Sequence, residues 1–145
     1  MRLQLVVLVG LLSITSIQAA EPAKRFGIEA DLKTYPQTTA KETLASVLKA
    51  IENKRYDYLV AQLADPEFID QRVKRIFGGK FEDQVEDTRL RLDSSFVKML
   101  QRFAKDGEWV GDGPTTVMLK DVKDRSVTFI KVGDRWFMQH SFKPE

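Results

Sequence analysis

The sequence has no cysteine in its 145 residues, and histidine and asparagine each occur once. Without cysteine the chain can form no disulfide, thiolate zinc site, cysteine nucleophile or lipid-attached cysteine. The single asparagine, Asn53, precedes Lys54 and Arg55, so there is no N-glycosylation acceptor. An exported chain with this composition must be held together by packing alone.

Charge of one sign is also not in excess. The 23 basic and 21 acidic residues give a net charge of +2, without the basic clusters of a nucleic-acid-binding domain. Residues 106–112 have aspartate and glycine at calcium-loop spacing, but Val110 occupies a ligand position. Gly78-Gly79-Lys80 lacks the upstream glycine and the following Ser/Thr of a phosphate loop. The sequence therefore predicts no metal, no cofactor and no nucleic-acid partner.

The first twenty residues have the three parts of a secretory signal peptide. Met1-Arg2 gives a positive start, residues 3–12 form a short apolar run, and Ala19-Ala20 supplies small residues for cleavage. The apolar run is shorter than the about 20 residues that a membrane span needs. We therefore expect residues 1–20 to be removed and the mature chain to be soluble in the bacterial periplasm or outside the cell, with no membrane span.

The mature chain is expected to contain an arm and one domain. Residues 21–37 carry Pro22, Gly27 and Pro36 and are predicted to form an N-terminal arm, mobile or loosely laid on the domain. Residues 38–145 have the size of a single domain.

Capped amphipathic segments begin the domain. Thr39 and Glu42 form a capping box, in which the hydroxyl accepts from the backbone of Glu42 and the carboxylate reaches back. The helix that follows is predicted to end near Asn53-Lys54, with a stripe of Leu44, Val47, Leu48 and Ile51. A second short helix is expected over residues 56–64, with Leu59, Val60 and Leu63 inward. Asp65-Pro66 closes it and suits the N-cap and first position of a third helix. That helix has the stripe Phe68, Ile69, Val73, Ile76 and Phe77, and Gly78-Gly79 ends it.

Residues 81–105 are again predicted to be helical. One face carries the apolar residues Phe81, Val85, Leu92, Phe96, Met99 and Phe103. Asp93-Ser94-Ser95 is a weak point, so the segment is expected to be either one bent helix or two helices.

From Asp106 onwards, β-rich runs at 115–120, 125–132 and 135–142 predict strands. Gly133-Asp134 indicates a two-residue hairpin loop that pairs Val132 with Arg135 and fixes the register. The face expected to meet the helices carries the pairs Lys131–Trp136, Phe129–Met138 and Val127–His140, followed by Phe142. The other face carries Thr128, Ile130, Phe137, Gln139 and Ser141.

Helices first and an antiparallel sheet last predict an α+β fold. Residues 39–51, the segment Lys54-Arg55-Tyr56-Asp57-Tyr58-Leu59 with its Leu63-Ala64-Asp65-Pro66 ending, and the hairpin of residues 129–137 resemble the nuclear-transport-factor-two-like superfamily. Its relatives include SnoaL-like cyclases, ketosteroid isomerases and lumazine-binding-like domains of cystatin-like layout. The resemblance covers most of residues 38–142. It implies a cone, with the N-terminal helices packed in the hollow of a curved antiparallel sheet, often with a pocket at the wide end. The superfamily holds enzymes, binding modules and interaction domains, so fold alone does not give function.

Three residues are candidates for acid–base chemistry. His140 titrates near neutrality and suits a general base at the mouth of the cone; alternatively it is a strand residue that covers part of the core. Asp57 and Tyr58, beside Tyr56, supply the carboxylate and phenol that ketosteroid isomerases combine; alternatively they form a helix start. We favour the structural interpretations and assign no catalytic residue. An isomerase, cyclase or hydratase is the alternative function.

The preferred hypothesis is a non-enzymatic domain whose cone binds a small apolar ligand or an envelope protein. The residues expected to contact the ligand are Tyr56, Trp109, Phe129, Trp136, Met138 and His140. Trp136 beside Lys131 is alternatively a cross-strand contact, and Trp109 a lid or a plug of the core. A second alternative is a structural homodimer through the open sheet face, including Ile130 and Phe137.

Overall fold

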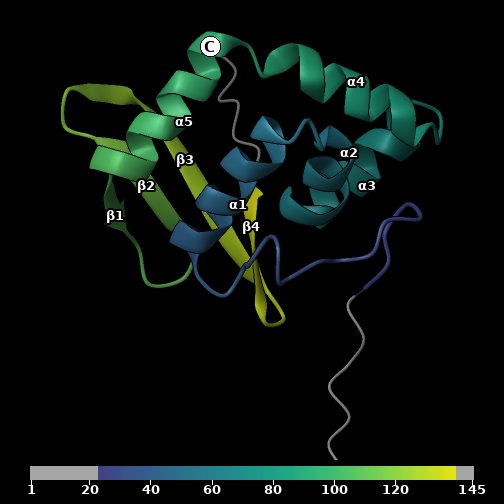
Figure 1. The fold of residues 1–145 in the computed structure, drawn as a ribbon, viewed down its shortest axis with the longest axis horizontal. Coiled ribbons are helices and arrows are strands. Elements are labelled where there is room, and N and C mark those ends of the chain that lie inside the picture. The colour runs from purple at the N-terminus through teal and green to yellow at the C-terminus, as the bar shows by residue number, and fades with distance from the viewer. Residues whose placement is uncertain (1–22, 140–145) are drawn as a thin grey trace, which may run out of the picture.

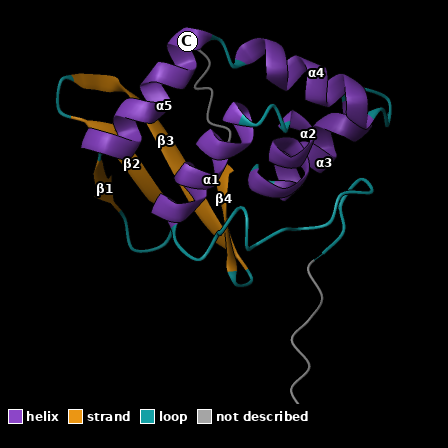
Figure 2. Cartoon of the chain, in the orientation of Figure 1, coloured by secondary structure: helices purple, strands orange, loops and turns teal. Residues whose placement is uncertain are grey.

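The computed structural model describes residues 23–139, in which helices cover one face of a four-stranded antiparallel sheet (Figures 1 and 2). The predicted α+β class is confirmed. The helical elements are α1 (Ala40–Glu52), α2 (Tyr56–Tyr58), the π-helix η1 (Leu59–Leu63), α3 (Pro66–Arg75), α4 (Phe81–Arg91) and α5 (Ser94–Asp106). The strands are β1 (Glu108–Val110), β2 (Thr115–Leu119), β3 (Val122–Val132) and β4 (Arg135–Gln139), in that spatial order. The predicted signal peptide lies outside the described residues.

The capping box predicted at the start of α1 is present. Thr39 Oγ1 accepts from the backbone N–H of Glu42 at 3.1 Å, and Glu42 Oε2 accepts from the backbone N–H of Thr38 at 3.0 Å. The return bond thus goes one residue further back than the N-cap itself. Two N–H groups that the helix cannot satisfy internally are paired, which fixes the point where α1 begins.

The helix predicted over residues 56–64 has an unexpected form. After the three residues of α2 the backbone widens into the π-helix η1, closed by the bond from Ala64 N–H to Leu59 C=O at 2.9 Å. All five residues of η1 are buried, including the predicted inward residues Leu59, Val60 and Leu63. This segment is enclosed on every side, so its polar face is buried as well as the predicted apolar stripe. Short π segments of this kind are often found at functional sites.

The start of α3 agrees with the prediction, but its end does not. Asp65 caps the helix, with Oδ1 accepting from Glu67 N–H at 3.1 Å, and Pro66 occupies the first turn. Ile69 and Val73 are buried as expected. Ile76 is 61% exposed, so its place in the apolar stripe is wrong. The helix ends at Arg75, and helical spacing no longer sets the direction of the side chains beyond that point.

Residues 81–105 form two helices, which answers the question that the sequence left open. Leu92 interrupts the helix with φ −84° and ψ 59°. Asp93 then caps α5, its Oδ1 accepting from Phe96 N–H at 2.8 Å. The predicted apolar face is nevertheless continuous, since Phe103 is buried and the other five members of the stripe pack partly buried against the core.

The hairpin register is confirmed over the described residues. Val132 pairs with Arg135, Lys131 with Trp136, and Phe129 with Met138, while the pair of Val127 with His140 falls outside the described residues. Gly133 has φ +60°, the left-handed conformation that a loop beginning with glycine requires. The sequence did not predict β1, whose three residues are too short to show alternation.

The free edge of β4 is covered by segments from distant parts of the chain. Met138 C=O accepts from Asp65 N–H at 2.9 Å, and Trp136 N–H donates to Gln37 C=O at 2.9 Å. An uncovered edge strand is a template for unwanted pairing, and these bonds close it.

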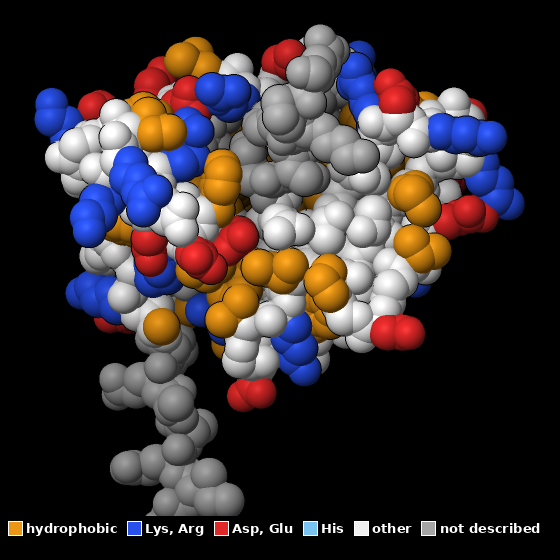
Figure 3. All heavy atoms as spheres, turned by 180° about the vertical axis from the view of Figure 1, so that it is seen from behind, with side chains coloured by type: hydrophobic (Ala, Val, Ile, Leu, Met, Phe, Trp, Pro, Cys, Tyr) orange, Lys and Arg blue, Asp and Glu red, His pale blue; other side chains and the backbone are white. Residues whose placement is uncertain are grey.

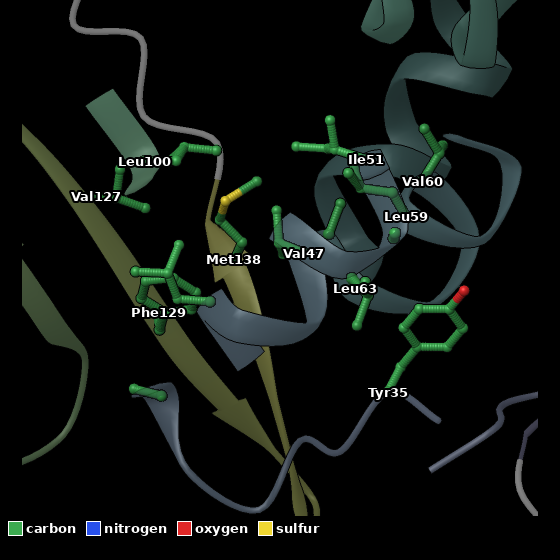
Figure 4. Packing of buried hydrophobic residues seen from close by; sticks show 14 of the residues in the cluster. Tyr35, Val47, Ile51, Leu59, Val60, Leu63, Leu100, Val127, Phe129 and Met138 are labelled. Carbon is green, nitrogen blue, oxygen red and sulfur yellow. The ribbon is translucent and has the colours of Figure 1, made fainter. Parts of the chain in front are cut away.

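The core lies between the sheet and helices α1 and α5, joined by η1 (Figure 4). Leu44, Val47, Leu100, Val117 and Phe129 are all 0% exposed. The helix-facing side of the sheet is therefore the apolar one, as predicted, and it is filled by side chains.

Candidate functional site

A buried polar network joins the N-terminal arm to the sheet. Gln37 is 2% and Gln62 0% exposed, and both side-chain oxygens accept from the Arg135 guanidinium, at 2.6 and 2.9 Å. Gln62 Nε2 donates in turn to the carbonyls of Ala23 and Ile28, at 2.9 and 2.7 Å. No buried side-chain polar atom in the described part of the chain is without a partner. Such a fully satisfied network specifies one arrangement of the arm.

The arm also clasps two helices. Arg25 pairs with Asp70 of α3 at 2.6 Å, and the Phe26 ring stacks on Phe81 of α4, with centroids 4.3 Å apart. Phe26 adopts φ +50°, which is unfavourable for a side chain of its size and indicates that the surrounding contacts hold it there. Residues 23–37 are thus anchored to the domain at a few positions, while most of the segment is exposed; the mobility of the arm stays a prediction.

Arg135 has an unusual environment. Burial lowers the pKa of its guanidinium, and its ion lies 5.0 Å from the centre of the Phe137 ring. Within residues 23–139 no carboxylate lies within ion-pair distance of it, so its hydrogen bonds are to neutral oxygens. With the Arg135 guanidinium over its ring, Phe137 is only 4% exposed. Its expected place on an open sheet face is therefore wrong.

The candidate acid–base residues face different surroundings. Tyr58 is 2% exposed, its hydroxyl accepts from Asp31 N–H at 2.9 Å, and burial raises the pKa of that phenol. The Asp57 carboxylate is 43% exposed and accepts from Arg55 Nε at 2.9 Å. Burial favours a higher pKa for Asp57, but the hydrogen bonds from Arg55 and from the backbone outweigh it and hold the pKa below its usual range. His140 lies outside the described residues. The Asp57 carboxylate is thus exposed and the Tyr58 hydroxyl enclosed, and neither pKa moves to the near-neutral value that suits a general base.

The residues expected to bind a ligand are spread over the molecule. Trp109 and Trp136 lie on opposite edge strands, β1 and β4. Phe129 is fully buried and contacts the Trp109 ring, with centroids 5.6 Å apart, and Tyr56 packs partly buried against the core. Trp136 pairs with Lys131 across the hairpin. Met138 lines an apolar cavity.

That cavity is a narrow apolar slot of about 30 Å³ between η1, the end of β4 and the α4–α5 junction. The slot is lined by Leu59, Val60, Ala64, Ile69, Thr88, Arg91, Leu92, Phe96 and Met138. Its volume is about that of one water molecule in the liquid, and its walls offer few polar groups to hold one. The only sequence signal near this slot is the interruption of the helical pattern at Asp93, between the two amphipathic segments that form α4 and α5.

The outer wall of the slot is α4, which is held by polar contacts. Its buried residues are Gln84 and Thr88, whose side chains bond to each other at 3.0 Å. Arg72 of α3 donates to Gln84 at 2.9 Å and to Asp87 at 3.1 Å. The Asp87 carboxylate also accepts from Arg91 at 2.9 Å, so Asp87 links Arg72 of α3 to Arg91, which lines the slot.

Other surfaces of the described chain offer less enclosure. A hollow of about 500 Å³ lined by Phe26, Asp70, Val73, Lys74, Gly78 and Gly79 is wide open to solvent, unlike a site that buries its ligand. Seen from behind, the molecule shows a broad area of uncharged side chains and backbone (Figure 3). On the outer face of the sheet, Val110 and Val132 are about half exposed and Ile130 is partly buried. Residues 23–139 contain no cluster of side chains that could hold a metal ion.

Comparison with known proteins supplies no relative from which a role could be carried over. No protein-family model matches the chain, and neither the curated proteins nor the solved structures include a match. Among the described helices, none has both the length and the apolar character needed to cross a membrane.

Proposed function

We propose that this chain is an exported, non-enzymatic binding domain of the nuclear-transport-factor-two-like type, and that its site is the apolar slot beneath α4. The observation that carries the proposal is an enclosed apolar cavity whose lining includes one charged side chain, that of Arg91. The ligand class that suits it is an apolar group joined to a carboxylate, as in an alkyl carboxylate or an acidic apolar peptide segment.

The surroundings of the candidate acid–base residues support binding over catalysis. A general base needs a pKa near the working pH and an open path to the ligand. The pKa of Asp57 is held low by its hydrogen bonds with Arg55, and the Tyr58 hydroxyl is enclosed beside Asp31. Neither residue lines the slot.

The size of the slot determines how it can bind. A volume of about 30 Å³ is far below the roughly 300 Å³ or more of sites that enclose a whole small molecule. The slot therefore takes the tip of an apolar chain, and deeper entry requires α4 to move outward. The interruption of the helix at Leu92 and Asp93, between α4 and α5, provides a hinge for that movement.

The proposal can be tested with sodium alkyl carboxylates of four to ten carbons, following the melting temperature and the NMR methyl shifts of the full chain. Each methylene that enters the slot is worth about 0.8 kcal/mol, which is about fourfold in affinity. We expect affinity to rise by this factor per methylene and then level off when the slot is full. Shift changes confined to residues far from the slot would contradict the proposal.

Two variants with matched controls locate the site. Ala64→Val fills the slot from its extended backbone at η1 and should abolish octanoate binding, whereas the same change at exposed Ala45 should leave it intact. Arg91→Gln should weaken the binding of carboxylates selectively. Arg89→Gln is the control and should leave that binding unchanged, because Arg89 pairs with exposed Glu86 on the same helix and does not line the slot. Equal losses in each variant and its control would contradict this location.

A further inference from the structure

We propose that the turn of residues 25–28 in the N-terminal arm is a latch that holds α4 closed over the slot. The tip of the latch is Phe26, which contacts α4, and its base is bonded to η1. The inference deepens the proposed function, because it rests on the slot assigned there and names the contact that regulates access to it.

The base of the latch is attached to η1 at two points. Arg25 Nε donates to the Ala61 carbonyl at 2.8 Å. The Ile28 carbonyl accepts from Gln62 Nε2 at 2.7 Å. Ala61 and Gln62 are both 0% exposed, and the Arg25 guanidinium also reaches Asp70 of α3 at 2.6 Å. The base is therefore fixed to the interior of the domain and is not the part that moves.

The tip of the latch has an unfavourable backbone. Arg25 and Ile28 bond to each other in both directions, at 3.0 and 2.8 Å. The two residues between them have positive φ, +50° at Phe26 and +79° at Gly27. A turn of this kind favours asparagine followed by glycine, since a large side chain is strained at positive φ. Phenylalanine at the tip is thus held in place by a contact outside the turn.

That contact is the ring of Phe81, the first residue of α4. The Phe26 and Phe81 rings stack with centroids 4.3 Å apart and an interplanar angle of 8°. The Arg25 guanidinium lies 5.3 Å from the centre of the Phe26 ring, so the fixed base also supports the tip. The latch accordingly lies beside α3 and the beginning of α4 (Figure 1).

The position of the stack along α4 makes it effective. The 11 residues of α4 span about 16 Å at 1.5 Å per residue, with Phe81 at one end and the hinge at Leu92 just beyond the other. Rotation about the hinge displaces the Phe81 end most. The part of α4 that lines the slot, Thr88 and Arg91, therefore cannot lift away while the two rings stay stacked.

The latch can also be released, because its tip borders solvent. Phe26 is 38% exposed and, with Asp70, lines the open hollow beside α3. Once separated from Phe81, the tip is free to relax to a favourable backbone, and the relief of strain offsets part of the lost stacking. The latch therefore favours the closed position of α4 without making it permanent.

Phe26→Asn tests the latch, because asparagine suits the positive φ of the turn but has no ring to stack. An aromatic pair is worth a factor of about 2 to 12 in an equilibrium constant. We expect amide hydrogen exchange in α4 of the full-length protein to become faster by this factor, with exchange in α1 unchanged. Leu32→Asn, at an arm residue outside the turn with a similar exposure of 41%, is the control and should change neither helix. Unchanged exchange in α4, or equal acceleration in α1 and α4, overturns the inference.

Phe81→Leu checks that the effect passes through the stack. Leucine keeps an apolar side chain against the core but removes the second ring. When Phe81→Leu is already present, the addition of Phe26→Asn should accelerate exchange in α4 no further, because both changes remove the same contact. Full additivity of the two changes overturns the inference.

Octanoate binding distinguishes the latch from the proposed ligand. If α4 must open before octanoate enters, Phe26→Asn should tighten binding by the same factor as it accelerates exchange, because the apparent dissociation constant scales inversely with the competent fraction. Equal octanoate affinity in wild type and variant, together with faster exchange in α4, overturns the regulation of the slot by the latch. Octanoate binding in neither protein removes the proposed function, and the exchange rates then decide the latch alone.

Discussion

Replacement of Arg135 by methionine tests whether the polar network holds the N-terminal arm on the domain. The change keeps an unbranched apolar side chain but removes every donor. Gln37 Oε1 and Gln62 Oε1 each lose the guanidinium that they bond, at 2.6 and 2.9 Å. The Gln62 carbonyl keeps its bond from Gln37 Nε2 at 3.0 Å, so two buried oxygens lose their donors.

The magnitude follows from these two atoms. A buried polar group left without a partner costs about 1–3 kcal/mol, so two cost roughly 2–6 kcal/mol. Removal of a partly buried positive charge that lacks a carboxylate partner among the described residues offsets part of this cost. We therefore expect Arg135→Met to lower the free energy of unfolding by about 3 kcal/mol.

Urea unfolding followed by circular dichroism measures this change, with Arg125→Met as the control. Arg125 is exposed on the neighbouring strand β3 and makes no hydrogen bond or ion pair with the described residues, so its replacement should change stability by less than about 0.5 kcal/mol. Arg135→Lys separates charge from geometry, since lysine keeps the charge but lacks the planar fork that reaches both glutamines. A loss in Arg135→Met within 1 kcal/mol of the control, or full stability in Arg135→Lys, would refute the network as the attachment of the arm.

Three further outcomes can be checked on single variants. Gly107→Ala places a Cβ 2.3 Å from the backbone oxygen of Phe103 and should cost about 1–3 kcal/mol in urea unfolding, whereas Gly113→Ala meets no atom within 4 Å and should be neutral. Burial raises the pKa of Tyr58, so above pH 10 the native state binds more protons than the unfolded state, and the free energy of unfolding falls as the pH rises. Tyr58→Phe should lose this decrease at alkaline pH, and the same decrease in the variant would contradict the assignment to Tyr58. Asp93→Ala removes the α5 cap and should cost about 1 kcal/mol, with faster hydrogen exchange in α4 and α5; unaltered exchange there would argue against a hinge.

The features that could be predicted from the sequence are those set by neighbouring residues. Thr39, Asp65 and the turn at Gly133 act through groups within a few positions, so their chemistry is visible in the sequence itself. The hairpin register followed from the turn alone, because side chains alternate strictly along a strand. The apolar faces of α1 and α5 were also recognised, because their apolar residues recur every three or four positions.

The features that were missed depend on distant partners. Arg135 and Gln37 are 98 positions apart, and no local pattern indicates that they bond. The same holds for the clasp of Phe26 on Phe81. The π form of η1 depends on its enclosure by several elements, and a helical pattern cannot separate it from an α-helix. Ile76 was wrongly assigned to the apolar stripe of α3 because the helical spacing of apolar residues continues in the sequence beyond Arg75, where the helix ends.

The slot belongs to this second group, and the contacts of its wall explain how it can serve a binding function without loosening the fold. Separating two apolar surfaces exposes area to water and costs free energy in proportion to that area. Separating Arg72 from Gln84 and Asp87 exchanges protein hydrogen bonds for bonds to water, at a net cost of about 0.5–1.5 kcal/mol for each neutral bond and more for charged ones. Phe81 and Val85 of α4 also pack against the core, but only partly buried, whereas α1 and α5 supply fully buried side chains to its centre. Movement of α4 about Leu92 therefore costs less than movement of α1 or α5. The helix whose buried residues are polar is the one that borders the slot, and this places the adjustable part of the molecule at its proposed site.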